Sequence, residues 1–296
     1  MTHFPLRALR SVDVEVADLA AATEFYTHVW GLALAERTVG GVWLRGTGAD
    51  PHLLALHAGP RSAIRSVTFR AAPDTELGAV AAAMLANGAT LVHDARALDE
   101  PGGGVAVAAR DAAGRTIRVV QGDAPAERLA DDPDRPERLA HVNINSDDVA
   151  RDTAFFERAL GFTLTDRSTM IAFVRTNRDH HSVVIAEAGV NTLNHVAFQL
   201  ATWEGVMRAC GRMIDRGFPI GWGPGRHGPG DNIFAYFVDP FGFVVEYTTE
   251  VLQLDDDYRV GGPEDWTWPP GRTDQWGIAP PKTAACKAAQ LAIPFA

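Results

Sequence analysis

The sequence predicts an α+β protein of two domains, each built from two β-α-β-β-β modules. The segment from Ser11 to Leu32 aligns with the segment from His141 to Phe162, at an offset of 141 − 11 = 130 residues. Within each half, the same order of strand-like and helix-like segments occurs twice. Residues 122–138 are rich in Asp, Pro and Arg, as is typical of a linker between such halves.

The first half begins with the strand-like run LRSVDVEV, and Asp18 is the candidate N-cap of a helix over LAAATEFYTHVW. Strand-like segments follow at residues 32–37, 41–45 and 52–57. The second module starts with IRSVTFRA, continues with a helix closed by Gly88, and ends with three strands, of which the last contains GRTIRVV. We assign residues 1–121 to an N-terminal domain.

The second half repeats this order after the linker. A helix is predicted at residues 148–160, then strands to about residue 187, the strand LNHVAFQL, a helix at 203–216, and strands at 233–238 and 243–248. Residues 139–250 therefore form the C-terminal domain.

Residues 251–296 form a tail rich in Trp, Pro and Gly, and its first part has neither helical nor strand periodicity. Trp266, Trp268 and Trp276 need a surface to pack on. The tail either anchors on the domain surface, or closes over a site or an oligomer contact.

Composition and charge limit the partners of the chain. Its formal charge is 27 − 37 = −10, which argues against nucleic acid or an anionic membrane surface as a main partner. The first residues lack a secretory signal, and no apolar run approaches the ~20 residues of a membrane span. Cys210 and Cys286 form no CxxC pair. We expect a cytoplasmic protein and, from its sheet edges and aromatic tail, a homo-oligomer.

Three candidate metal ligands lie in the second half, and their counterparts in the first half are different residues. The candidates are His141, His195 and Glu246; the counterparts are Ser11, Ser66 and Arg118, at offsets of 130, 195 − 66 = 129 and 246 − 118 = 128. A histidine needed only for packing should have a core-like counterpart, so this asymmetry favours a site over core histidines.

Two histidines and one carboxylate suit a catalytic metal with open coordination positions. Non-haem Fe(II) is typical of this set, and Mn(II) accepts it as well. A closed structural zinc site is disfavoured, because it normally uses four ligands, commonly including thiolates.

The chain resembles the type I extradiol ring-cleavage dioxygenases of the vicinal oxygen chelate superfamily, which has a glyoxalase-like fold. The resemblance covers both domains and is most specific in HVNIN, NRDHHSVVIA, LNHVAFQL and GPGRHGPGDNIFAYFVDPFGFVVEY. It implies an N-terminal domain without metal and an active C-terminal one. It also implies that Fe(II) and O2 cleave a catechol-type diol beside its hydroxyl groups, giving a muconic semialdehyde-type product.

The resemblance also implies roles for single residues. It makes His141, His195 and Glu246 the metal ligands, His181 the acid-base residue, His227 and Tyr236 hydrogen-bonding groups around the diol, and Asn143 a residue lining the pocket. Only one of His180 and His181 should enter the cavity, because adjacent strand residues face opposite ways. The motif position selects His181, and His180 is then a surface or supporting residue. The alternatives are an exposed loop histidine at 227 and a core tyrosine at 236.

Substrate contacts beyond the diol are less defined in the sequence. Asp231 and Asn232 follow His227 closely, and either side chain could face the substrate. Arg272 could pair with a substrate carboxylate if the tail folds over the cavity, and otherwise it is a surface arginine.

Two other functions remain open on this scaffold, because one fold hosts many activities. A glyoxalase or thiol transferase would use the metal as a Lewis acid without oxygen chemistry. The set of His181, His227 and Tyr236 argues against that. A ligand-sequestering protein would need no metal, and the three ligand-type residues argue against it.

Overall fold

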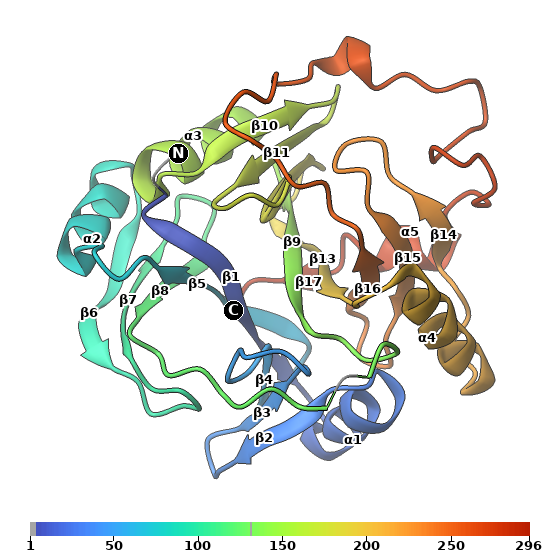
Figure 1. Cartoon of the computed structure of the whole chain (residues 1–296). Coiled ribbons are helices and arrows are strands. Elements are labelled where there is room, and N and C mark those ends of the chain that lie inside the picture. The colour runs from blue at the N-terminus through green and yellow to red at the C-terminus, as the bar shows by residue number, and fades with distance from the viewer. Residues whose placement is uncertain (1–3, 131) are drawn as a thin grey trace.

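The computed structural model describes residues 4–130 and 132–296. Its strands form one sheet in each half, with the orders β2-β3-β4-β1-β5-β8-β7-β6 and β10-β11-β12-β9-β13-β16-β15-β14 (Figure 1). A short strand, β17, pairs with β13 off the path of the second sheet. The predicted two-domain α+β fold is confirmed.

The first half contains β1 (Leu6–Val16), α1 (Leu19–Glu24), the π-helical turn η1 (Phe25–Val29), β2 (Ala33–Arg37), β3 (Val42–Arg45), β4 (Leu54–Ala58), β5 (Ala63–Ala71), α2 (Leu77–Ala86), β6 (Thr90–Ala97), β7 (Val105–Arg110) and β8 (Thr116–Gln121). The second half contains β9 (Arg138–Ser146), α3 (Val149–Leu160), β10 (Thr163–Arg167), β11 (Ile171–Arg175), β12 (Val183–Glu187), β13 (Thr192–Gln199), α4 (Trp203–Asp215), β14 (Trp222–Arg226), β15 (Ile233–Val238) and β16 (Val244–Thr249). The tail adds η2 (Pro263–Asp265), α5 (Ala284–Ala289) and β17 (Ile293–Pro294).

The strand pairing agrees with the repeat read from the sequence. In both sheets, the first strands of the two modules are antiparallel, and each runs parallel to the last strand of its own module. Equivalent register pairs are Asp13–Ser66 and Asn143–His195 across these antiparallel strands, and Thr68–Arg118 and Ala197–Glu246 across the parallel ones. Ser66 and Arg118 therefore occupy the places of His195 and Glu246.

Short polar side chains begin the helices where the sequence predicts. Asp18 accepts a hydrogen bond from the backbone N–H of Ala21, and Asp148 accepts one from that of Arg151. Helix α3 ends at Gly161, whose φ of 69° is in the left-handed region that favours glycine. Among the described residues, none of the helices combines the length and apolar character needed to span a membrane.

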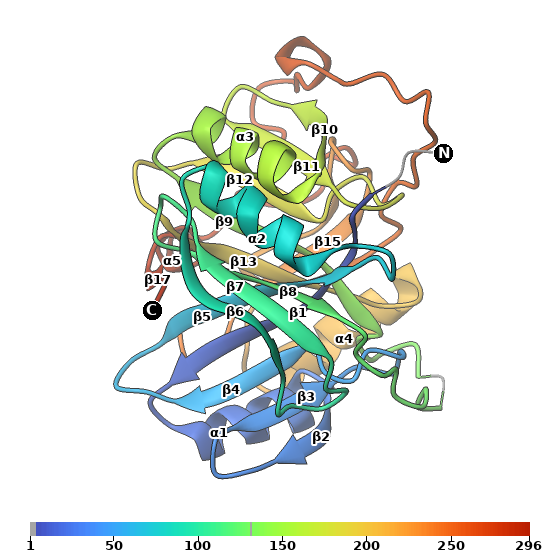
Figure 2. The ribbon, with the colours of Figure 1, turned by 90° about the vertical axis from the view of Figure 1, so that its left-hand side faces the viewer.

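Aromatic side chains join the two halves into a continuous core. The fully buried Trp30, from the turn after η1, stacks on Tyr247 of β16 with ring centroids 3.7 Å apart. The Tyr26 hydroxyl donates to Asp239 at 2.6 Å. Helices α2 and α3, one from each half, lie side by side (Figure 2). The second sheet is thus held in place partly by residues of the first domain.

The tail has more regular structure than its composition indicates. It passes round the second sheet and returns beside β14 and β15, where α5 lies (Figure 1). Thr283 caps α5 by accepting from the backbone N–H of Cys286, and Leu193 of β13 pairs with Ile293 of β17. Both elements are too short for periodicity to reveal them. Their position brings the end of the chain close to the strand that carries His195.

Candidate active site

Three ligand-type side chains converge on one face of the second sheet. His141 lies on β9, His195 on β13 and Glu246 on β16, and all three are buried. The Nε2 atoms of the two histidines are 3.1 Å apart. The Oε2 of Glu246 lies 3.2 Å from His141 Nε2 and 3.1 Å from His195 Nε2. Among the described residues, this is the only group of three or more His, Cys, Asp or Glu whose ligand atoms converge.

The chemistry of this donor set fits a divalent cation. Glu246 Oε2 is buried and accepts no hydrogen bond from the described residues. Burial alone would raise the pKa of the Glu246 carboxyl, but the neighbouring His141 and His195 lower it well below its usual range. Burial lowers the pKa of His195 to about 4. The arrangement therefore offers an ionised carboxylate and a neutral imidazole, which are the forms that bind metal.

A chain of amides orients His195. Its Nδ1–H donates to Asn194 Oδ1 at 2.8 Å, which leaves the lone pair of Nε2 directed toward Glu246. The same Asn194 oxygen accepts from Gln290 Nε2 at 2.6 Å. Gln290 belongs to the tail, so residues 251–296 help to complete the candidate metal site.

Replacing Asn194 by alanine is expected to weaken metal binding about 10- to 100-fold, because partners that orient a ligand contribute at this scale. Competition with a coloured chelator measures the affinity. Asn87→Ala is the matched control, since this amide bonds to Ala83 in the first domain, remote from the site. An unchanged affinity in Asn194→Ala would rule out the orienting role.

A second chain of hydrogen bonds orients His181. Asp166 is fully buried, and its carboxylate accepts from His180 Nε2 at 2.7 Å. With that proton on Nε2, the Nδ1 of His180 is an acceptor and receives the Nδ1–H of His181, 3.0 Å away. The Nε2 of His181 then carries a free lone pair.

His181 itself is buried against the candidate ligands. Its ring centroid is 4.4 Å from that of His141. Burial, together with the neighbouring His141, lowers the pKa of His181 well below its usual value, so the ring is neutral. Gly230 closes over it with a φ of 86°, and a Cβ there would lie 2.7 Å from a His181 ring carbon. A glycine is required for this close approach.

His227 and Tyr236 form another part of the site. The His227 Nε2 lies 3.0 Å from the Tyr236 hydroxyl, which is 3.5 Å from His195 Nε2. The His227 ring stacks on Phe234 with centroids 3.9 Å apart. Burial lowers the pKa of His227 to about 3 and raises that of Tyr236 well above its usual value. Both groups are neutral hydrogen-bonding partners next to the ligand set.

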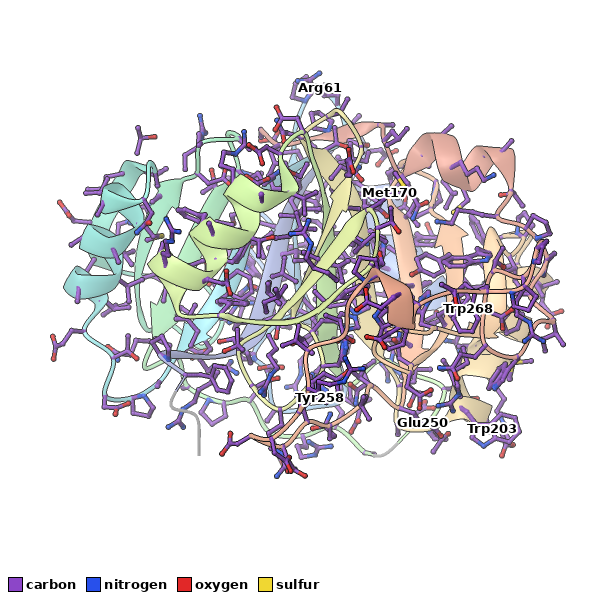
Figure 3. All side chains as sticks on the ribbon, turned by 90° about the horizontal axis from the view of Figure 1, so that it is seen from above. Arg61, Met170, Trp203, Glu250, Tyr258 and Trp268 are labelled. Carbon is purple, nitrogen blue, oxygen red and sulfur yellow. The ribbon has the colours of Figure 1, made fainter. Side chains whose placement is uncertain are left out.

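These side chains border a cavity of about 450 Å³. One wall is apolar and includes Ile171, Phe173 and Val184. Met170 of the β10–β11 loop and Trp268 of the tail, both labelled in Figure 3, also line it, as does Trp266. The tail therefore does cover the site, as one of the two sequence interpretations proposed. Trp276 instead anchors the tail on the domain surface, where the Arg226 Cζ lies over its ring at 5.5 Å from the centroid.

The structure separates the predicted substrate contacts. Asn143 lines the cavity, whereas Asn232 is fully buried and donates to Thr248 Oγ1 at 2.8 Å and weakly to Glu246 Oε1 at 3.4 Å. Asp231 turns away from the cavity to Arg226, at 3.1 Å. Arg272 is exposed and does not line the cavity, because the tail turns outward there. The structure therefore does not place Asn232, Asp231 or Arg272 at the cavity, and for Arg272 it agrees with the alternative of a surface arginine.

His181 was selected over His180 on its motif position, and the structure places His181 at the cavity wall. The expectation that the two histidines are neighbours on a strand was wrong, because both lie in the connection between β11 and β12. His180 is a fully buried supporting residue. Sequence reasoning missed Asp166, Asn194, Lys282 and Gln290; only Asn194, adjacent to a ligand, carried a local signal.

The equivalent place in the first domain is filled by ion pairs. Arg118, which occupies the position of Glu246, contacts Asp13 at 3.1 Å and Glu100 at 2.7 Å. A cavity of about 630 Å³ borders these ion pairs and is larger than the one beside the candidate ligands. It is lined by the Arg118 guanidinium at the position where the second domain has the Glu246 carboxylate. This arrangement explains physically why the duplicated scaffold offers the metal set in one copy.

Comparison with known proteins gives a consistent family. The sequence model of the Glyoxalase/Bleomycin resistance protein/Dioxygenase superfamily matches residues 8–119 and 138–247. Metapyrocatechase 2 from Cupriavidus necator is 30% identical, covering 90% of this chain and 87% of the relative. The chain therefore belongs to this superfamily, and the resemblance stated from its motifs is confirmed.

Solved structures of two kinds of enzyme share the fold. The Mn(II)-bound glyoxalase from Novosphingobium aromaticivorans has a TM-score of 0.88 at 30% identity, covering 96% of this chain and 94% of its own. The homoprotocatechuate 2,3-dioxygenase from Arthrobacter globiformis has a TM-score of 0.82 at 26% identity, covering 93% of this chain and 89% of its own. This chain therefore shares its overall fold with both kinds of enzyme.

Proposed function

We propose that this protein is an extradiol catechol dioxygenase. The observation that carries the proposal is the combination of a two-histidine, one-carboxylate set with a third histidine, His181, whose lone pair is oriented by Asp166 through His180. Similar proteins support this class, since the relative metapyrocatechase 2 and the structural neighbour homoprotocatechuate 2,3-dioxygenase are extradiol dioxygenases.

His141, His195 and Glu246 are the proposed ligands of Fe(II), with Mn(II) as the alternative ion for the same set. When bound, this ion supplies a positive, redox-active centre with open positions at which a diol and dioxygen can react. The residues around it then determine how the diol binds and where its protons go.

We assign three tasks to the surrounding side chains. His181 accepts a diol proton at its free Nε2 and can return it later, as a general base and then a general acid. His227 Nε2–H donates to the Tyr236 hydroxyl oxygen, and the Tyr236 O–H hydrogen-bonds the second diol oxygen and stabilises negative charge that develops there. Phe173, Ile171 and Val184 pack against the aromatic ring and keep water away from it.

A metal-dependent glyoxalase is the second candidate, and the structural likeness to the Mn(II)-bound glyoxalase favours it. Such an enzyme uses the ion as a Lewis acid and consumes no oxygen. The oriented His181 beside an aromatic-sized cavity favours the dioxygenase.

Oxygen consumption separates the two candidates. The protein is loaded with Fe(II) without air, mixed with a panel of catechols, and then exposed to air in an oxygen electrode with an absorbance record. We expect a yellow ring-opened product and one dioxygen consumed for each diol. Metal binding without oxygen uptake across the panel, together with turnover of hemithioacetals, would establish the glyoxalase instead.

Asp166→Asn tests how His181 is oriented. An amide donates to His180 Nε2 and drives the His180 proton onto Nδ1, which reverses the chain and removes the free lone pair of His181. We expect kcat to fall roughly 10²- to 10⁴-fold with metal content unchanged. Tyr258→Phe is the control, because it removes one hydrogen bond to Asp166 but leaves the carboxylate. Equal losses in both variants would refute the orienting role.

The remaining partners follow from the same proposal. The substrate is a catechol-type small molecule, with dioxygen as co-substrate. We also propose a cytoplasmic location, for which the two free, buried cysteines Cys210 and Cys286 are suited, and assembly as a homo-oligomer.

A further inference from the structure

A single lysine from the tail reaches the cavity. Lys282 is one of only two lysines in the chain, and it precedes α5. Its Nζ donates to Gln290 Oε1 at 2.7 Å and lies over two aromatic rings, 4.5 Å from the Trp222 centroid and 5.7 Å from that of Tyr236. These three contacts fix the position of the ammonium group.

The charge of this ammonium is not compensated inside the cavity. The described residues that line the cavity include no Asp, Glu or Arg. Within the described part of the chain, Gln290 is the hydrogen-bond partner of Nζ, and no carboxylate lies within ion-pair distance of it. The carboxylate that interacts with it electrostatically is Glu246, which belongs to the candidate ligand set. An ammonium has three donors, so two remain for a ligand. A half-buried charge without a counter-ion is costly unless something of opposite sign binds beside it.

The place of Lys282 relative to the ligand set is defined by Tyr236. The hydroxyl of Tyr236 is 3.5 Å from His195 Nε2, whereas its ring faces Nζ. The ammonium is therefore about one aromatic ring away from the candidate metal ligands. Gln290, which accepts from Nζ, and Thr273, which accepts from Trp222 Nε1 at 3.4 Å, also line the cavity, and together with Lys282 they form its polar end.

We propose that Lys282 binds an anionic substituent of the substrate, so that the preferred diols are catechols carrying a carboxylate on the ring or on a short side chain. The inference rests on the proposed function, because the ring must be held by its two hydroxyl oxygens at the ligand set. A carboxylate at the polar end receives the two free N–H groups in charge-assisted hydrogen bonds. Trp222, Tyr236 and Gln290 hold the ammonium in place before the substrate arrives.

Three pairs of substrates test this. Each pair is a catechol acid and its uncharged primary amide: 3,4-dihydroxybenzoate, 3,4-dihydroxyphenylacetate and 3-(3,4-dihydroxyphenyl)propionate. We expect kcat/KM of the wild type to favour the acid in at least one pair, and Lys282→Met to reduce that acid-to-amide ratio about 10- to 100-fold. Lys287→Met is the matched control, because it removes the other, exposed lysine, and the ratio should stay as in the wild type.

A binding measurement separates this inference from the proposed activity. Calorimetry without oxygen, on the metal-loaded protein, gives the Kd of each acid and amide for the wild type, Lys282→Met and Lys282→Gln. In Lys282→Gln the new amide can still donate to Gln290 but carries no charge. This variant therefore replaces Lys282→Met in the test if the methionine variant does not fold.

The outcomes are distinct. Tighter binding of an acid that depends on Lys282, with no cleavage of any diol, would support the anion site while refuting the dioxygenase. Cleavage of acids and amides with the same ratio in wild type and both variants would support the dioxygenase and overturn the inference. Equal losses for acid and amide would also overturn it, because Lys282 would then act only through the position of Gln290.

Discussion

His195→Ala is expected to abolish stable metal retention and to lower kcat/KM at least about 10³-fold, since bound metal contributes several kcal/mol to such reactions. The variant leaves His141 and Glu246 as two ligands of the one group of three that converges among the described residues. Metal content after desalting, measured by atomic emission, and catechol turnover report the two losses.

The duplicated scaffold supplies the control for this variant. Ser66 occupies the position of His195 in the first domain and is also buried, so Ser66→Ala perturbs an equivalent place without touching the ligand set. Metal and activity should be retained in Ser66→Ala. The first domain should stay folded in both variants. Unchanged metal content in His195→Ala would remove the central assignment.

His181→Asn is expected to lower kcat roughly 10²- to 10⁴-fold while metal binding is preserved. Asparagine provides a hydrogen-bonding group of smaller size but cannot accept and return a proton. Because the His181 ring lies close to Gly230 and to His141, a smaller side chain avoids the overpacking that an aromatic replacement would cause. Steady-state oxygen uptake and metal analysis of the purified variant measure the two effects separately.

His28→Asn is the matched control for this substitution, since His28 is exposed on η1 and remote from the cavity. If His181→Asn keeps the kcat of the wild type, the proton acceptor lies elsewhere. His227 would then be the next candidate, because its Nε2 lies 3.0 Å from the Tyr236 hydroxyl.

Much of the site was predictable because the duplication supplies an internal comparison. His141, His195 and Glu246 stand out against Ser11, Ser66 and Arg118 at equivalent strand positions, and the strand register bears out that alignment. Strands and capped helices were also predictable, since their signals are local.

The contributions of the tail were not predictable. The sequence left two readings of Arg272 open, a contact with a substrate carboxylate or a surface position, and the residue is exposed. It gave no sign of Lys282, which lies ten residues later and lines the cavity. The path of a segment without periodicity depends on what it packs against, and this cannot be read from neighbouring residues. Asp166 was missed for a similar reason, because its contact with His180 joins β10 to a distant connection.

The central claim is that this one site uses dioxygen to open an aromatic diol. The most direct measurement is the mass spectrum of the product formed by the Fe(II)-loaded protein from a catechol acid under isotopically labelled dioxygen. The account predicts a ring-opened product that carries both labelled atoms. A ring-opened product without label, or an unchanged diol despite bound metal and a full panel of catechols, would contradict it.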